Sequence, residues 1–169
     1  MVITPEKKKL AVKTVWSGCM PVSSGESSLV YPVVAQMERG ERDSEENCGT
    51  GGVFSGTVGQ CPAPISDSRR FVSSAIMAEC LAIRSAVMHA ASLNIKSLMI
   101  LSDSQSLVKL VKERGSVPAL FGILFDIYHF SLLFDVIFFS YVPRLSNVMT
   151  DSVAKSALSL LNLASSNGV

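Results

Sequence analysis

Three acidic side chains stand out because each lies in a largely uncharged stretch of the sequence. Between Asp67 and Asp103 the only acid is Glu79. After Asp135 the only acid is Asp151. Ligands of open α/β sheets bind near the carboxyl ends of strands, and carboxylate oxygens are the ligands that hard cations prefer. If Glu79, Asp103 and Asp151 meet at one end of a sheet, they form a candidate divalent-metal site.

Each of these acids also has a structural explanation when it is taken alone. Asp103 and Asp151 are candidate helix N-caps, which contribute about 1 kcal/mol each. Glu79 lies near the start of a predicted helix, where the helix dipole favours a negative charge. Capping does not explain why three carboxylates lie in surroundings of low charge. The metal-site interpretation therefore depends on Glu79, Asp103 and Asp151 taken together.

The elements that would position the acids can be read from hydrophobic periodicity. We predict helices over residues 74–93, 104–114, 118–134 and 150–163, and buried strands over 96–102 and 135–142. Phe71 and Val72 are expected in another short strand, after a turn at residues 62–67. Helices that alternate with buried strands favour an α/β layer.

Glycines at residues 49, 51 and 52 open the first readable strand. No helix follows them directly, so they are weak evidence for phosphate binding. Close packing of the strand against a neighbour is the better interpretation. Residues 1–47 are poorly defined, apart from a strand-like stretch at 29–37. We therefore expect one domain over 48–163 and a C-terminal tail at 164–169.

Composition narrows the class of protein further. The chain has 169 residues, of which 48% are hydrophobic and 17% charged, as expected for a globular domain. Its net charge of +1 gives no strongly basic coat, although a local basic patch remains compatible with nucleic-acid binding. Asp126 and Asp135 interrupt the apolar stretch 119–141, which argues against a transmembrane segment.

Four cysteines, at positions 19, 48, 61 and 80, form neither a C-x-x-C pair nor a zinc-ligand set. The N-terminus carries no apolar export signal. We therefore expect isolated thiols in an intracellular protein that is not secreted.

Three motifs carry a resemblance when they are taken together. Residues 77–86 read MAECLAIRSA, residues 102–105 read SDSQ, and residues 142–155 read VPRLSNVMTDSVAK. In this order and at this spacing they resemble the ribonuclease H domain of plant retroelement reverse transcriptases and its stand-alone relatives. The resemblance implies a ribonuclease H-like α/β fold, with a mixed five-stranded sheet flanked by helices.

The resemblance also implies a chemistry, which is hydrolysis of the RNA strand of RNA–DNA hybrids. Glu79, Asp103 and Asp151 match three of the family's four metal-binding acids and are the expected catalytic residues. The expected ions are Mg²⁺, with Mn²⁺ as the alternative. Two such ions about 4 Å apart stabilise both the attacking water and the leaving oxygen.

Polar residues beside these acids are candidates for binding an RNA–DNA hybrid or another nucleic acid. We expect Arg144, Asn147 and Lys155 to contact the phosphate backbone, and Ser104 or Gln105 to reach a 2′-hydroxyl group. A solvated surface is the alternative for each of them. Many family members carry a mobile His in the loop after the last strand. His89 and His129 lie in predicted helices instead, where we expect them to be partly buried packing residues.

The fourth acid of the family, an Asp on the first strand, has no counterpart. Residues 33–41 contain no Asp, and Ala35 or Met37 takes its position. Glu38 and Asp43 are the nearest acids, but their flanking residues do not match the family. Two hypotheses follow. The chain is either a hybrid-cleaving endoribonuclease, or a nucleic-acid-binding module or retroelement remnant with impaired catalysis.

Overall fold

The computed structural model describes residues 28–39, 46–53, 55–56, 63–146 and 148–166. Its centre is a mixed sheet in the strand order β4-β2-β1-β5-β6, and a further two-residue strand, β3, pairs with β1. β1 is antiparallel to β2 and β3 but parallel to β5, and β5 is parallel to β6. The strands are β1 (Ser28–Arg39), β2 (Glu46–Gly52), β3 (Ser55–Gly56), β4 (Ile65–Arg69), β5 (Ser97–Ser102) and β6 (Val136–Tyr141).

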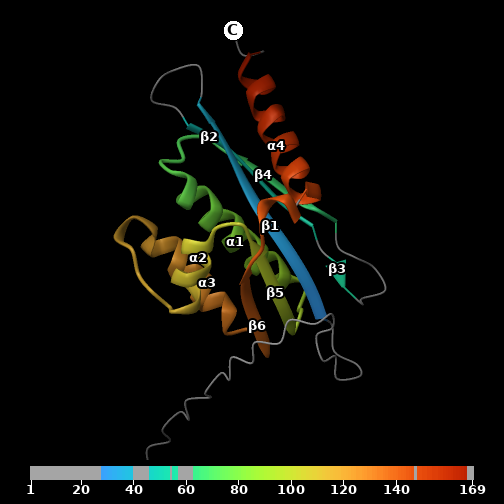
Figure 1. The fold of residues 1–169 in the computed structure, drawn as a ribbon, viewed down its shortest axis with the longest axis vertical. Helices are drawn as coiled ribbons and strands as arrows, with labels where there is room; N and C mark the ends of the chain where they lie inside the picture. The colour runs from blue at the N-terminus through green and yellow to red at the C-terminus, as the bar shows by residue number, and fades with distance from the viewer. Residues whose placement is uncertain (1–27, 40–45, 54, 57–62, 147, 167–169) are drawn as a thin grey trace, which may run out of the picture.

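Four α-helices accompany the sheet in the described part of the chain (Figure 1). They are α1 (Ala75–Ser92), α2 (Gln105–Lys112), α3 (Phe121–Ser131) and α4 (Val148–Ser166). Ser74 caps α1, because its hydroxyl accepts a hydrogen bond from the Met77 N–H at 3.3 Å. The helix expected from Pro118 begins as a 3₁₀ turn, Pro118–Leu120, and a second 3₁₀ turn, Arg144–Ser146, precedes α4.

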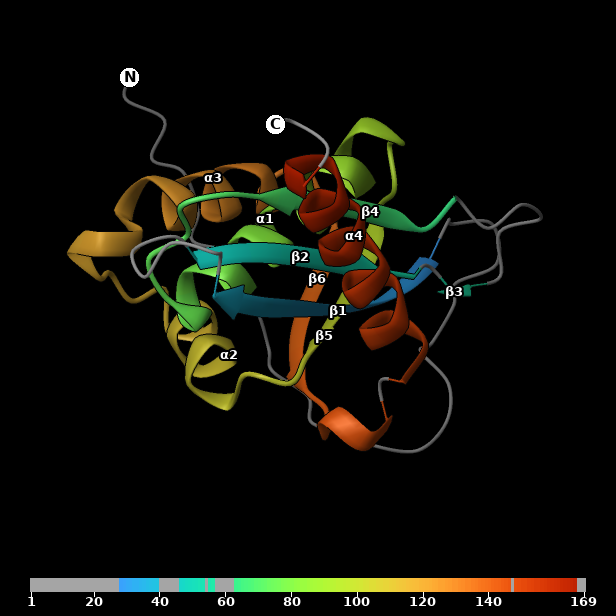
Figure 2. The ribbon, with the colours of Figure 1, turned by 90° about the horizontal axis from the view of Figure 1, so that it is seen from above.

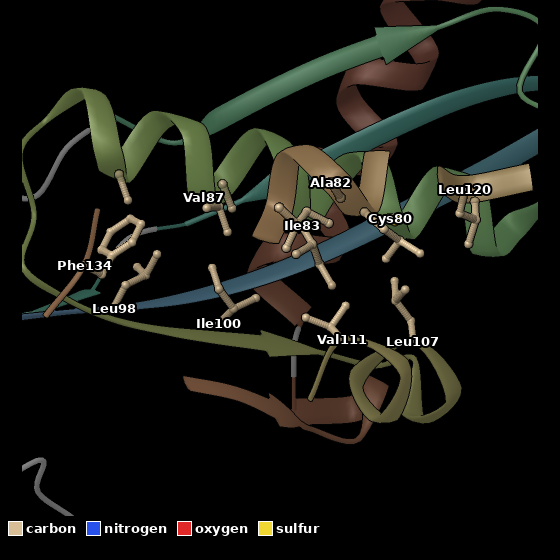
Figure 3. Packing of buried hydrophobic residues seen from close by; sticks show 14 of the residues in the cluster. Cys80, Ala82, Ile83, Val87, Leu98, Ile100, Leu107, Val111, Leu120 and Phe134 are labelled. Carbon is tan, nitrogen blue, oxygen red and sulfur yellow. The ribbon is translucent and has the colours of Figure 1, made fainter. Parts of the chain in front are cut away.

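The main hydrophobic core lies between the sheet and the helices α1, α2 and α3 (Figure 3). β5 contributes Leu98 and Ile100, whose side chains alternate with half-buried neighbours and are almost completely buried. Ile83 of α1, Leu107 of α2 and Leu124 of α3 pack in the same cluster. Three helices therefore share one face of the sheet.

The opposite face is covered by α4 (Figure 2). This helix packs on β2 at two glycines. A Cβ atom added at Gly51 would lie 2.7 Å from the Thr150 carbonyl oxygen, and one added at Gly49 would lie 2.8 Å from the Leu158 nitrogen. Cys48, one residue before Gly49, is instead buried on the α1 side. This alternation separates the two faces, and it confirms the close-packing interpretation of the glycine-rich strand.

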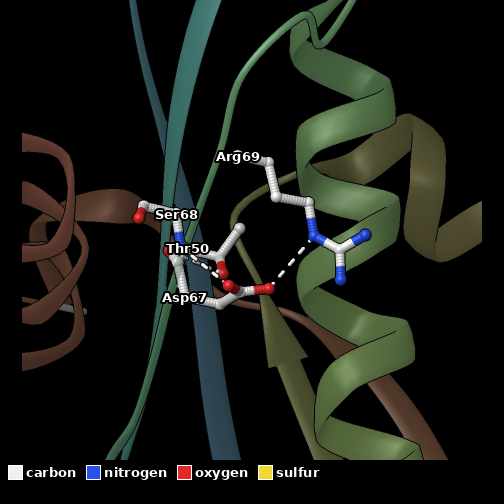
Figure 4. Close-up of polar contacts among 4 residues, drawn as sticks. All are labelled: Thr50, Asp67, Ser68 and Arg69. Atoms are coloured by element: carbon white, nitrogen blue, oxygen red, sulfur yellow. Dashed lines mark hydrogen bonds and ion pairs between the residues drawn. The ribbon is translucent and has the colours of Figure 1, made fainter. Parts of the chain in front are cut away.

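The expected strand at Phe71 and Val72 was wrong. The strand is β4, which begins inside the turn expected at residues 62–67 and ends at Arg69. Phe71 is 70% exposed and adopts a positive φ of 60°. β4 is an edge strand, so its polar sequence ISDSR carries no hydrophobic alternation. It is held by pairing with β2 and by Asp67, whose carboxylate accepts hydrogen bonds from the Ser68 N–H at 2.9 Å and the Arg69 Nε–H at 3.0 Å (Figure 4).

The apolar stretch at residues 119–141 is divided between α3 and β6. In the part of the chain that the structure describes, no helix has both the length and the apolar character needed to cross a membrane.

Candidate nucleic-acid and metal site

Asp103 lies at the point where β5 ends. Ser102 is the last residue of the strand, Asp103 forms a bend, and Ser104 is the N-cap residue of α2. The buried Ser102 hydroxyl accepts a hydrogen bond from the Ser104 N–H at 3.2 Å, and the Ser102 carbonyl accepts one from the Val142 N–H at 2.9 Å. The N-cap residue of α2 is thus Ser104 and not Asp103, which directly precedes it.

Backbone register identifies the β1 residue beside Asp103. Val33 of β1 pairs with Ser102 of β5 in the parallel ladder. The ladder ends at this pair, because Asp103 lies in the bend after β5, and Val34 is the β1 residue that follows next, ahead of Ala35 and Met37. We infer from this register that position 34 is the β1 position nearest to Asp103.

Asp151 approaches the same part of β1 through α4. Gly51 of β2 pairs with Val34, and the Thr150 carbonyl lies against Gly51. Asp151, the acidic residue of the first turn of α4, follows Thr150 directly. The bend at Asp103 and the first turn of α4 therefore flank one residue of the central strand.

Glu79 lies in α1, on the opposite face of the sheet from α4. It is half-buried between Ala78 and Cys80, both of which are fully buried. Ala78 packs with Cys48, whose partner on β1 is Met37. Glu79 is thus near the C-terminal half of β1, as Asp103 and Asp151 are, and a closer approach of the three carboxylates around bound ions stays a prediction.

The acidic side chains that the structure describes do not form a complete site for two metal ions. Among the residues whose side chains the structure describes, no three His, Cys, Asp or Glu side chains group closely enough to hold a metal ion. Glu38, the nearest acid on β1, lies four residues beyond Val34, about 13 Å along the strand, and pairs with Asn47. It therefore does not replace an acid at position 34.

Lys155 and Asp151 form an ion pair on α4, with 2.6 Å between Nζ and Oδ2. The Asp151 side chain is 16% exposed and that of Lys155 is 64% exposed. The sequence predicts a metal ion as the ligand of Asp151 and a phosphate group as the ligand of Lys155, rather than a contact between the two residues. Their i,i+4 spacing in a predicted helix was the signal that could have revealed the pair.

The other predicted nucleic-acid contacts are placed only in part. Ser104 is half-buried and Gln105 is exposed, both at the start of α2 beside Asp103. The backbone of Arg144 belongs to the second 3₁₀ turn, but its side chain lies outside what the structure describes. Asn147 lies outside the described residues altogether.

The two histidines lie in helices, as expected. His89 is half-buried near the end of α1. His129 is exposed on α3, where its ring stacks on Phe125 with a centroid distance of 6.1 Å and meets Phe130 edge-on at 5.6 Å. His129 therefore makes ring contacts on α3, but the expected partial burial is wrong because the residue is exposed.

Cys48 and Cys80 are free, buried thiols, as the sequence predicted. Burial, together with the nearby Asp67, raises the pKa of Cys48 to about 11, against a smaller lowering by Arg69. Burial alone raises the pKa of Cys80 to about 12. Both thiols stay protonated at neutral pH and are poor nucleophiles. Cys19 and Cys61 lie outside the described residues.

Comparison with solved structures supports the fold. The N-terminal ribonuclease H domain of a Mycobacterium tuberculosis protein, solved as a fusion with maltose-binding protein, superposes with a TM-score of 0.69. It is 21% identical, and the match covers 83% of this chain and 99% of that one. Ribonuclease H1 of the halophilic archaeon Halobacterium salinarum gives a TM-score of 0.66 at 21% identity, covering 79% of this chain and 98% of that one.

A third structure is a ribonuclease H1 from compost, LC11, solved in complex with an RNA/DNA hybrid. It gives a TM-score of 0.62 at 17% identity, covering 79% of this chain and 99% of that one. At these identities the likeness shows the fold alone, which is ribonuclease H-like.

Sequence comparison gives the family. No curated protein matches the chain. The model of one protein family, described as reverse transcriptase-like, matches residues 39–157, which include β2, the helices α1 to α3 and the acids Glu79, Asp103 and Asp151. The chain therefore belongs to the reverse transcriptase-like family and has a ribonuclease H-like fold.

Proposed function

We propose that this domain binds RNA–DNA hybrids at the end of the sheet where Asp103 and the first turn of α4 flank β1, and that it cleaves the RNA strand only weakly. The observation that carries the proposal is the register of β1 on β5, which pairs Val33 with Ser102 and makes Val34 the next β1 residue toward Asp103. An apolar side chain at that position supplies no oxygen ligand to a divalent ion.

Support for binding comes from the fold and from the residues kept around Asp103. LC11 ribonuclease H1, which shares the fold, was solved with a hybrid bound. Ser104, Gln105 and Lys155 are polar residues at the same end of the sheet, and the last two are exposed. Hydroxyl and amide groups suit the 2′-hydroxyls of RNA, and an exposed ammonium suits phosphate.

Glu79, Asp103 and Asp151 are the residues that would hold Mg²⁺, or Mn²⁺ in its place. When bound at a complete site, such ions supply charge stabilisation to a phosphodiester undergoing hydrolysis. Three acids without the fourth do not complete that site, so we assign binding as the main role.

The test compares binding and cleavage in matched variants. Labelled RNA–DNA hybrid is incubated with the purified chain, Val34→Asp and Ala35→Asp, in Mg²⁺ and in Mn²⁺. We expect hybrid binding by all three, weak cleavage by the unmodified chain, and a rise in cleavage for Val34→Asp only. Ala35→Asp is the control, since neighbouring residues of a strand point to opposite faces. Equal cleavage by both variants would contradict the assignment of position 34.

The second candidate is an active endoribonuclease, which the presence of three of the four family acids favours. Strong cleavage by the unmodified chain, lost in Asp103→Asn, would establish it. Cleavage that survives Asp103→Asn would belong to another site or to a contaminant.

A further inference from the structure

An ammonium group already touches one of the carboxylates that the resemblance assigns to a metal ion. Lys155 Nζ lies 2.6 Å from Asp151 Oδ2, within one turn of α4. The acid precedes the base by four residues, which is the favourable order for a helical pair. Because the Asp151 side chain is largely buried, the ammonium compensates part of the cost of removing the carboxylate from water.

Asp151 and Lys155 differ in how far each can move. Ala154 and Leu158 are buried, and the backbone of Ala154 lies against Gly49 and Gly51. The Asp151 backbone therefore cannot shift unless α4 separates from β2. Lys155 has a long flexible stem and an exposed side chain, so the ammonium is the part of the pair that can adjust to a ligand.

We propose that Lys155 is the internal counter-cation of Asp151 and joins that carboxylate to a phosphate oxygen of bound nucleic acid, so that hybrid binding here needs no divalent ion. The inference rests on the proposed function. An ammonium has three N–H donors, so it can donate to Asp151 and to a phosphate oxygen at the same time.

The same contact disfavours a metal ion at Asp151. A divalent cation must either displace the ammonium from Oδ2 or bind beside a positive charge. The neighbouring β1 position adds no negative charge to offset this, because it holds Val34. The chain therefore supplies its own monovalent cation at the place where the family resemblance predicts a metal.

The first experiment measures Mn²⁺ binding without nucleic acid, by electron paramagnetic resonance, for the unmodified chain, Lys155→Gln and Lys96→Gln. Lys96 is the matched control, since it directly precedes β5 and so lies at the opposite end of that strand from Asp103. Lys155→Gln is expected to bind Mn²⁺ about two- to fivefold more tightly, the range set by a partly exposed ion pair. Adding Asp151→Asn should remove the gain. An unchanged affinity in Lys155→Gln overturns the inference.

The second experiment measures hybrid affinity by fluorescence anisotropy, in EDTA and in Mg²⁺. The unmodified chain and Lys96→Gln should bind equally well in both. Lys155→Gln should bind more weakly in EDTA, with its salt dependence reduced by about one phosphate contact, and should recover part of its affinity in Mg²⁺.

A requirement of the unmodified chain for Mg²⁺ overturns the phosphate link, as does unchanged binding by Lys155→Gln in EDTA. If the unmodified chain binds no hybrid in either buffer, the proposed function fails and the phosphate link fails with it. The Mn²⁺ titration then still decides whether the ammonium excludes a metal from Asp151.

Discussion

Arg84 Nε and Asp126 Oδ2 lie 2.6 Å apart and join α1 to α3. The two side chains are 28% and 33% exposed, so solvent screens part of their attraction. We expect Arg84→Ala to lower the free energy of unfolding by about 1 kcal/mol, measured by urea denaturation. A double-mutant cycle with Asp126→Ala isolates the pair from the loss of Arg84 packing. A coupling energy near zero would show that the contact adds nothing to stability.

Replacement of Gly51 by Ala should separate α4 from the sheet. The added Cβ would meet the Ala154 nitrogen at 2.5 Å and the Thr150 carbonyl oxygen at 2.7 Å, and both of these α4 atoms belong to the backbone. We expect a loss of about 1–3 kcal/mol in urea denaturation. Gly122→Ala on α3 is the control, because no described atom lies within 4 Å of an added Cβ there and Ala favours a helix. If both variants unfold at the same urea concentration, the close contact of α4 with β2 is wrong.

Thr150 is 1% exposed, and its hydroxyl has no hydrogen-bond partner among the residues that the structure describes. Thr150→Val keeps the shape and removes the unsatisfied group, so we expect stability to rise by about 1 kcal/mol in a thermal or urea melt. Thr50→Val makes the opposite test. The Thr50 hydroxyl donates to the Asp67 carbonyl at 3.3 Å, so its removal should lower stability. A destabilised Thr150→Val variant would mean that the hydroxyl has a partner.

The buried thiols should make stability depend on alkaline pH. The pKa of Cys48 is raised from about 9 to about 11, chiefly by burial, so the folded state holds this proton more tightly than the unfolded state. The stabilisation linked to this proton is complete below pH 9 and is lost as the pH rises through 11. Cys48→Ala should flatten this part of the profile, measured by urea denaturation between pH 8 and pH 11.

Thiol alkylation gives an independent check on the same residues. At pH 8, Cys48 and Cys80 should react only in denaturant, because the folded chain buries them as neutral thiols. Rapid labelling of either residue in the native chain would contradict their burial.

Much of the fold could be predicted because its signals are local. The apolar spacing and Ser74 fixed the start of α1 to within a residue, and the motif around Asp103 identified the end of β5. β4 could not be found in this way, since an edge strand with the sequence ISDSR pairs through its backbone and needs no apolar face.

The candidate site was harder to predict because its main features are not local. The β1 residue nearest to Asp103 is set by the parallel register of β1 on β5, two strands almost seventy residues apart. No sequence pattern in either strand predicts this register. The pairing of Arg84 with Asp126 spans 42 positions and has the same origin. Only the Asp151–Lys155 pair was readable, since both residues lie on one helix.

The glycine contact between β2 and α4 also bears on the order in which the molecule forms. Gly51 and Thr150 are 99 positions apart (150 − 51), so their contact closes a very long loop, and long loops close late in folding. The strands and the helices α1 to α3 can assemble before that step. We expect Asp151 and Lys155 to be the last members of the candidate site to arrive, so that a nascent or partly unfolded chain holds Asp103 in place before any nucleic-acid contact from α4 exists.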